Sequence, residues 1–199
     1  MVLLIKELEE QRKGRNKKTT INYKYINSGN YRRKFDCVSN EPKLNRLLYK
    51  LSKKMLKHRS GTLFEDMYWI DLDRISVVAS EDNGDVEEQI LYSQKTIQIV
   101  REYKNLLTIH SHPNSFPPSI SDLNSNYTNG YAMGIIVCHD GKIYMYSASE
   151  EINEKYYSMT VAEYLNQGYT ENEAQIMSLN HIKERFDMQF KEVTGDDIM

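Results

Sequence analysis

Apolar residues recur at helical spacing in the segment that follows Pro42. The apolar positions are Leu44, Leu47, Leu48, Leu51 and Met55. Intervals of three and four residues place them on one face of an α-helix, and lysines and arginines occupy most of the other positions. Asn40 and Pro42 form a start signal, and Gly61 marks a stop. The pattern therefore predicts an amphipathic helix between Pro42 and Gly61.

Beyond Gly61 the pattern becomes that of β-strands. Runs rich in aromatic and β-branched residues predict strands at residues 64–72, 75–79, 90–92, 106–109, 131–138 and 142–147. Ser93 is the candidate cap of a short helix, and the proline- and serine-rich residues 113–121 predict a loop. Two further helices are predicted at residues 154–166 and 170–192. Helices that alternate with strands indicate a single domain of the α/β (α+β) class.

Charge and periodicity divide the chain into three predicted parts. Residues 1–38 form a basic N-terminal arm with little periodicity, residues 39–150 form the central domain, and residues 151–199 form a C-terminal helical extension packed on that domain. From Arg12 to Lys34 every formal charge is positive. The arm has two readings, which are contact with a nucleic acid or acidic partner and a solvated, partly disordered tail. Because no DNA-binding motif accompanies the charge, the tail is favoured.

The overall composition is that of an ordinary water-soluble protein. Hydrophobic residues make up 40% of the 199 residues, charged residues 27%, and the formal net charge is -2. This charge gives no global attraction to nucleic acid, and no run approaches the length of a membrane helix. Cys37 and Cys138 form no disulfide framework, so a cytoplasmic location is expected. His139 precedes a turn at Asp140 and Gly141 and is predicted to lie on the surface.

The residues that carry chemistry follow the strand predicted at residues 106–109. Residues two apart on a strand share a face, so His110 and His112 can direct two imidazoles at one point. After the proline-rich loop, Asp122 can return a carboxylate to that point. Two nitrogens and one oxygen leave a fourth position open, which is the arrangement of a catalytic zinc site. Imidazole with carboxylate suits Zn²⁺ better than Ca²⁺ or Mg²⁺.

This stretch, His-Ser-His-Pro followed by Ser-Ile-Ser-Asp, resembles the signature of the JAMM (MPN-plus) zinc metalloproteases. The resemblance covers about residues 41 to 150. It implies the JAB fold, a curved mixed sheet of the cytidine-deaminase-like type flanked by helices, for residues 39–150. It also implies a zinc ion held by His110, His112 and Asp122. The loop before Ser119 is one residue shorter than in the commonest family pattern, which leaves both Ser119 and Ser121 as candidates to face the site.

The resemblance also assigns the catalytic groups. Family members place a catalytic carboxylate near the start of the first core strand, a position that Glu65 occupies here. Asp66 is its neighbour and would face the opposite way on a strand. Ser119 is expected to position water or the developing oxyanion. Glu65 would accept a proton from a zinc-activated water and return it to the leaving amine.

The sequence therefore predicts a zinc metallopeptidase that hydrolyses an amide or isopeptide bond in a protein or peptide substrate, with a ubiquitin-like protein as one candidate. Two alternatives remain. The first is a JAB-fold scaffold that binds partners without catalysis. The second is a DNA-associated protein of the RadC type, which shares the motif and for which only the basic arm offers independent support.

Overall fold

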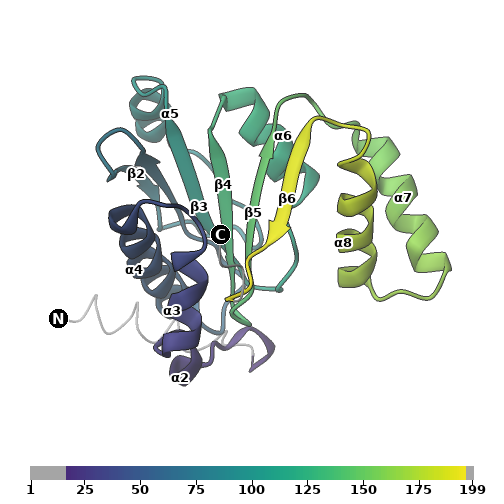
Figure 1. Cartoon of the computed structure of the whole chain (residues 1–199), viewed down its shortest axis with the longest axis horizontal. Helices are drawn as coiled ribbons and strands as arrows, with labels where there is room; N and C mark the ends of the chain where they lie inside the picture. The colour runs from purple at the N-terminus through teal and green to yellow at the C-terminus, as the bar shows by residue number, and fades with distance from the viewer. Residues whose placement is uncertain (1–16, 196–199) are drawn as a thin grey trace.

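Six strands form one mixed sheet in the computed structural model, which describes residues 17–195 (Figure 1). The strands are β1 (Met67–Asp71), β2 (Ser76–Glu81), β3 (Leu106–His112), β4 (Met133–Cys138), β5 (Ile143–Ala148) and β6 (Met188–Glu192). Their order in the sheet is β2-β1-β3-β4-β5-β6. Only the β3–β4 pair is parallel, because α6 (Ile120–Asn129) carries the chain from one strand to the next. The sheet flanked by helices confirms the predicted α/β (α+β) class.

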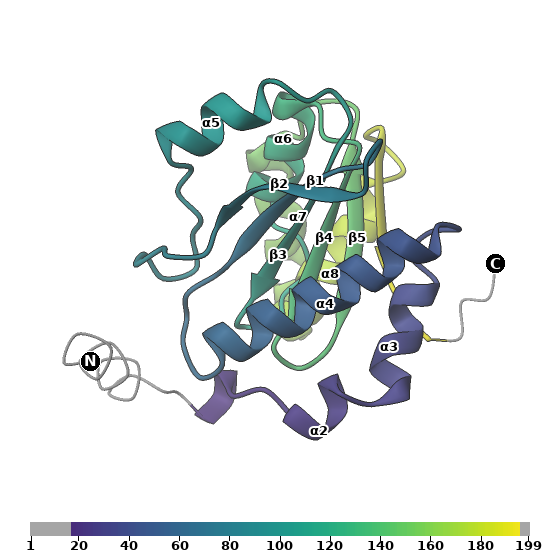
Figure 2. The same ribbon diagram turned by 90° about the vertical axis from the view of Figure 1, so that its left-hand side faces the viewer.

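One face of the sheet is covered by α4 (Pro42–Arg59), with α2 (Tyr23–Ile26) and α3 (Gly29–Asp36) beside it (Figure 2). The predicted amphipathic helix is confirmed, although Glu41 rather than Asn40 caps it by accepting the Lys43 N–H. Its buried residues, such as Leu48 and Met55, pack on Ile109 and other inward residues of the strands. Burial of this apolar stripe holds the helix on the sheet.

The opposite face carries α5 (Gln94–Val100), α6 and α8 (Glu171–Ile182), and α7 (Glu154–Asn166) packs against α8 (Figure 1). Because side chains alternate along a strand, Ile109 faces α4 while His110 faces the α6 layer. Ser93 caps α5 as predicted. Among residues 17–195, no helix is both long enough and apolar enough to cross a membrane.

The predicted basic arm differs most from the structure. Residues 17–19 form a short 3-10 helix, and Asn22 and Ser28 cap α2 and α3. Tyr31 and Phe35 are fully buried against α4, so this part of the arm belongs to the core rather than to a solvated tail. Residues 1–16 lie outside the described range.

Three other expectations about local structure are wrong. Residues 90–92 form no strand, and residues 120–129 of the structure are a helix where a loop was expected to run to residue 121. The last predicted helix ends at Ile182, after which β6 adds to the edge of the sheet beside β5. The C-terminal segment is therefore a helical hairpin followed by a strand.

Candidate metal centre

His110 and His112 are fixed by the middle of the sheet. They lie at the end of β3, between β1 and β4, with Met67 opposite His110 on one side and Ile136 on the other. His110 is 2% exposed. Two neighbouring strands restrict the backbone here, and the two-residue period brings both imidazoles to the α6 face, with ring centroids 4.8 Å apart.

Asp122 reaches the histidines from the first turn of α6. Ser119 is the N-cap of this helix, and its Oγ accepts a hydrogen bond from the Asp122 N–H. In return, Asp122 Oδ2 accepts hydrogen bonds from the Ser119 N–H at 2.8 Å and from the Ser119 Oγ–H at 2.7 Å. This capping box holds the carboxylate in place and leaves Oδ1 directed at His110. Both Ser119 and Ser121 line the adjoining cleft.

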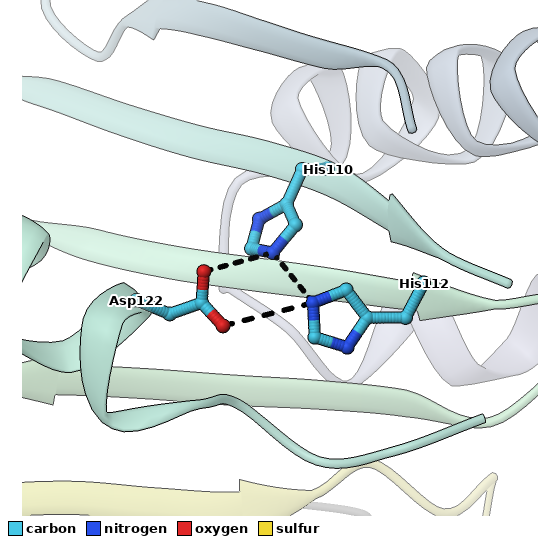
Figure 3. Close-up of side chains that lie close together, drawn as sticks. All are labelled: His110, His112 and Asp122. Carbon is cyan, nitrogen blue, oxygen red and sulfur yellow. Dashed lines mark hydrogen bonds and ion pairs between the residues drawn. The ribbon is translucent and has the colours of Figure 1, made fainter. Parts of the chain in front are cut away.

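The three side chains point at one another (Figure 3). The two Nε2 atoms lie 3.0 Å apart, His110 Nε2 is 3.3 Å from Asp122 Oδ1, and His112 Nε2 is 3.6 Å from Asp122 Oδ2. Ligands held at about 2.0–2.1 Å from a tetrahedral Zn²⁺ are separated by about 3.3 Å. The closest pairs of donor atoms are near this spacing, although the two histidines face different oxygens of Asp122, so the residues fit a tetrahedral metal ion such as zinc with one position left open.

Proton positions in the cluster also favour a cation. His112 Nδ1–H donates to the Phe116 carbonyl at 3.0 Å, so in the neutral ring Nε2 directs its lone pair at the cluster. Burial and the neighbouring His110 lower the pKa of His112 to about 4. Burial opposes protonation of His110 too, but the Asp122 carboxylate outweighs it and raises the pKa of His110. A metal ion bound here would replace any proton held among the three donors.

Glu65 shares the cleft with these residues. It immediately precedes Asp66, whose carbonyl accepts a hydrogen bond from the Ser111 N–H, and this places Glu65 beside the end of β3. Glu65 is 9% exposed. Burial raises its pKa to about 8; the positive charge of His110 opposes this, while Asp122 and Glu88 add to it. A carboxyl group whose pKa lies near neutral pH can both accept and donate a proton, and the charge of a bound cation would lower that pKa and favour the proton-accepting form.

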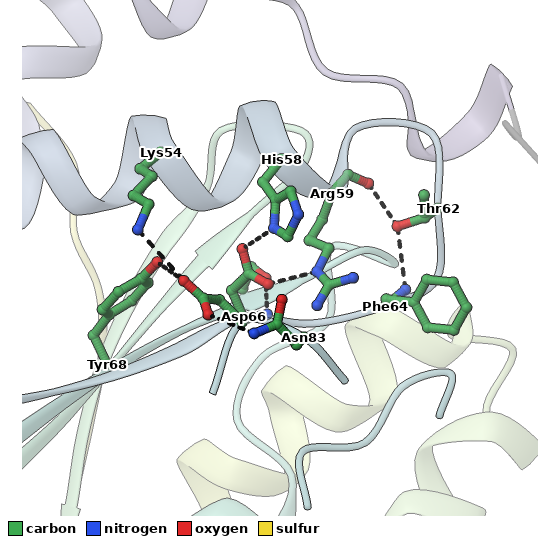
Figure 4. Close-up of polar contacts among 10 residues, drawn as sticks. Lys54, His58, Arg59, Thr62, Phe64, Asp66, Tyr68 and Asn83 are labelled. Atoms are coloured by element: carbon green, nitrogen blue, oxygen red, sulfur yellow. Dashed lines mark hydrogen bonds and ion pairs between the residues drawn. The ribbon is translucent and has the colours of Figure 1, made fainter. Parts of the chain in front are cut away.

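Asp66 points to α4, on which it contacts His58 and Arg59 (Figure 4). Its carboxylate is fully buried and pairs with Arg59 Nε and with His58 Nδ1, the latter at 2.8 Å. Its backbone N–H donates to Ser111 Oγ at 3.0 Å. Asp66 therefore ties the start of β1 to α4 and to β3, and it fixes the backbone that carries Glu65.

A cleft of about 510 Å³ opens onto the cluster. The residues described along its wall include no lysine or arginine, whereas Glu65, Glu88 and Asp122 all line it. Asn114 donates a hydrogen bond to Glu88 Oε1 and so joins the segment after β2 to the loop after β3 across the mouth of the cleft. Tyr146 contributes to the wall, with its ring 6.4 Å from that of His110. Glu88 and Tyr146 were not among the predicted site residues, because each reaches the cleft only through tertiary contacts.

His139 is not on the surface as predicted. It is 3% exposed, and its Nδ1–H donates to the Thr19 carbonyl at 2.6 Å. The residue therefore links the β4–β5 turn to the N-terminal segment, and it is absent from the wall of the cleft.

Comparisons with protein-family models, with curated proteins and with solved structures gave no match to this chain. The function is therefore inferred from the geometry of the site and from the sequence motif.

Proposed function

We propose that this chain is a zinc-dependent hydrolase that cleaves an amide or isopeptide bond in a protein or peptide substrate. The observation that carries the proposal is the convergence of His110, His112 and Asp122, whose donor atoms all lie within 4.8 Å of one another. Two imidazoles and one carboxylate favour zinc over calcium or magnesium. The substrate class follows from the sequence resemblance to the JAMM metalloproteases.

Several residues that line the cleft have a defined part in the proposed reaction. When bound, zinc supplies Lewis-acid polarisation of a carbonyl and acidifies a water. Glu65 accepts a proton from water at its carboxylate and delivers it to the leaving amine. The hydrogen bond that His112 Nδ1–H donates to the Phe116 carbonyl orients one imidazole, and Ser119 holds the Asp122 carboxylate. The remaining volume of the cleft receives the substrate chain.

Metal analysis tests the centre directly. The purified chain, incubated with Zn²⁺ and dialysed, should retain about one zinc per chain, because its ligands match a three-residue site. His112→Ala removes one of the converging donors and should lose that zinc. His181→Ala is a matched control, since His181 lies on α8 and outside the described wall of the cleft. A parent protein that retained no zinc would favour the scaffold alternative.

The second test separates metal binding from catalysis. Glu65→Gln keeps the size of the side chain but removes its basicity, so hydrolysis should fall by about 10²–10⁴-fold while zinc is retained. Glu88→Gln makes the same change on an exposed residue of the same cleft and should leave most of the activity. Both are assayed on a linear peptide and on a lysine isopeptide conjugate. Full activity in Glu65→Gln would show that another group is the base.

A further inference from the structure

The outward face of α4 carries a continuous row of cationic side chains. The row consists of Lys43, Arg46, Lys50, Lys53, Lys54 and Lys57. At about 100° per residue, all six positions fall within an arc of about 100°. Buried residues such as Leu48 and Met55 occupy the opposite side of the helix, and Pro42–Arg59 contains no acidic residue. We call these six residues the α4 basic face.

Most of the six cationic side chains make no contact that would neutralise their charge. Lys43 Nζ donates to the Arg74 carbonyl, Lys53 lies over the Tyr49 ring, and Lys54 pairs with Asp82 at 3.4 Å. Arg46, Lys50 and Lys57 are exposed and, within residues 17–195, have no hydrogen bond, ion pair or ring contact. Their charges remain available to a partner.

The neighbouring helix also carries exposed cations. α3 packs beside α4 on the same side of the sheet (Figure 2), and its Arg32 and Arg33 are exposed. The whole chain has a formal net charge of -2, so the positive charge on these two helices is a local concentration. Like charges at helical spacing repel one another, and an anionic partner would offset that repulsion.

We propose that the α4 basic face binds the phosphodiester backbone of a nucleic acid, without selecting a base sequence. Lys43 to Lys57 span about 21 Å of helix at about 1.5 Å per residue. One strand of a duplex presents a phosphate about every 3.4 Å along the axis, so about six phosphates fall within that length. The row of cations is thus long enough to reach several phosphates on the near side of the winding strand.

Phosphates explain this surface better than an acidic protein or a membrane does. The cores of protein interfaces are depleted of lysine and rich in aromatic and apolar anchors. No large apolar residue is exposed on α4; those exposed in residues 17–195 include Leu91, Met159 and Leu165, which lie on other elements. A membrane-surface helix inserts an apolar face, whereas that face of α4 is buried against the sheet.

The surface is independent of the metal centre. α4 covers one face of the sheet, and His110 faces the helices on the other. The expectation that nucleic acid is not a partner rested on the overall charge and on the segment before α4. Neither argument applies to α4 itself, on which the side chains of Arg46, Lys50 and Lys57 make no ion pair within residues 17–195.

Fluorescence anisotropy of the full chain tests the proposal. The probes are a labelled duplex DNA of about 30 base pairs and a single-stranded RNA of about 30 nucleotides, titrated between about 50 and 200 mM KCl. Binding to either probe should weaken with salt with a log–log slope of about -3 or steeper. The triple variant Arg46→Glu, Lys50→Glu, Lys57→Glu should bind at least about tenfold more weakly and with a shallower slope.

A matched control separates the contribution of the α4 basic face from the effect of a change in net charge. Lys95→Glu, Arg101→Glu, Lys104→Glu makes the same change in charge with the same residue types, on and after α5, at exposed positions. This control should bind like the parent, and circular dichroism should show both triple variants folded. Binding to the DNA alone or to the RNA alone also supports the proposal and identifies which nucleic acid supplies the phosphates.

Four outcomes would overturn the proposal. The first is a parent chain that binds neither probe at about 50 mM salt, and the second is an α4 variant that binds as well as the parent. The third is an equal loss in the two triple variants, which would assign binding to net charge. The fourth is tighter binding to poly-glutamate, or to vesicles that contain phosphatidylserine, than to either nucleic acid.

Discussion

At the scale of single residues, the shape of the cleft depends on a position without a side chain. Gly134 lies on β4, directly opposite Tyr146 of β5. A Cβ atom at residue 134 would overlap the Tyr146 ring. That ring is 3% exposed and stands edge-on to His110. Because Gly134 has no side chain, the Tyr146 ring can lie against β4 and form the wall of the cleft beside His110, a candidate metal ligand.

Gly134→Ala should therefore damage both the fold and the metal centre. The added methyl group must displace the Tyr146 ring, and overpacking of this kind costs about 1–3 kcal/mol. The displaced ring would press on His110, so zinc affinity should fall as well. Chemical denaturation and zinc titration measure the two effects. Gly84→Ala, where nothing lies within 4 Å of the new Cβ, is the control and should change neither quantity.

At the scale of elements, the α4 basic face should make α4 less stable than a helix with the same buried face and a mixture of positive and negative charges outside. Lys50 has Arg46 four residues before it, and Lys53 and Lys54 follow at three and four residues. Each like-charged pair at this spacing destabilises a helix by about 0.2–0.5 kcal/mol, and each opposite pair stabilises it by a similar amount. The positive charge of this helix is therefore an energetic cost in the isolated chain.

Lys50→Glu should consequently raise the free energy of unfolding by about 1 kcal/mol, because it replaces three repulsive pairs with attractive ones. Lys50→Gln, which removes the repulsion alone, should give a smaller gain. Urea denaturation at low and high salt measures both, and the gains should shrink as salt screens the charges. A destabilised Lys50→Glu variant would show that Lys50 has a structural role.

Elements whose apolar residues recur regularly over many positions could be predicted from the sequence. The helix at Pro42–Arg59 and the buried strand that leads into His110 are both found, since their spacing is visible over many residues. The two-residue period likewise predicted that His110 and His112 share a face. The helices at residues 23–36 were missed because they are too short to show a period, although Asn22 and Ser28 were readable as caps.

Other elements depend on contacts that a sequence pattern does not reveal. Residues 188–192 read as a continuation of the preceding helix, but the free edge of β5 pairs with them as a strand. Ser119 and Asp122 were interpreted as parts of a catalytic motif, and the same two residues form the capping box that begins α6. The buried position of His139 depends on Thr19, which lies 120 residues away and could not be inferred from its own neighbours.

At the scale of the whole molecule, the Thr19 carbonyl joins three distant segments. It accepts hydrogen bonds from His139 Nδ1 in the β4–β5 turn and from the Gly61 N–H after α4. Burial lowers the pKa of His139 below its ordinary value of 6.5, with the hydrogen bond to Thr19 opposing this shift. The folded protein therefore holds the neutral ring, whereas the unfolded chain takes up a proton more readily.

A pH dependence of stability follows from this difference. The contribution of neutral His139 is fully present above pH 6.5 and is lost as the pH falls through the lower pKa of the folded state. His139→Gln keeps a donor for Thr19 but does not titrate, so its unfolding free energy should fall less between about pH 7 and 5. Denaturation of both proteins across this range measures the effect. Parallel profiles would assign the acid sensitivity to other groups.

The candidate ligands also share one short stretch of chain, since His110 and Asp122 bound the segment 110–122. A cation held there would close a loop of only about a dozen residues, and short loops lose little chain entropy on closure. The cation would link the end of β3 to the first turn of α6 and would need no ligand from other parts of the sheet. Metal binding should therefore survive local opening of the α7–α8 hairpin and slow the separation of β3 from α6.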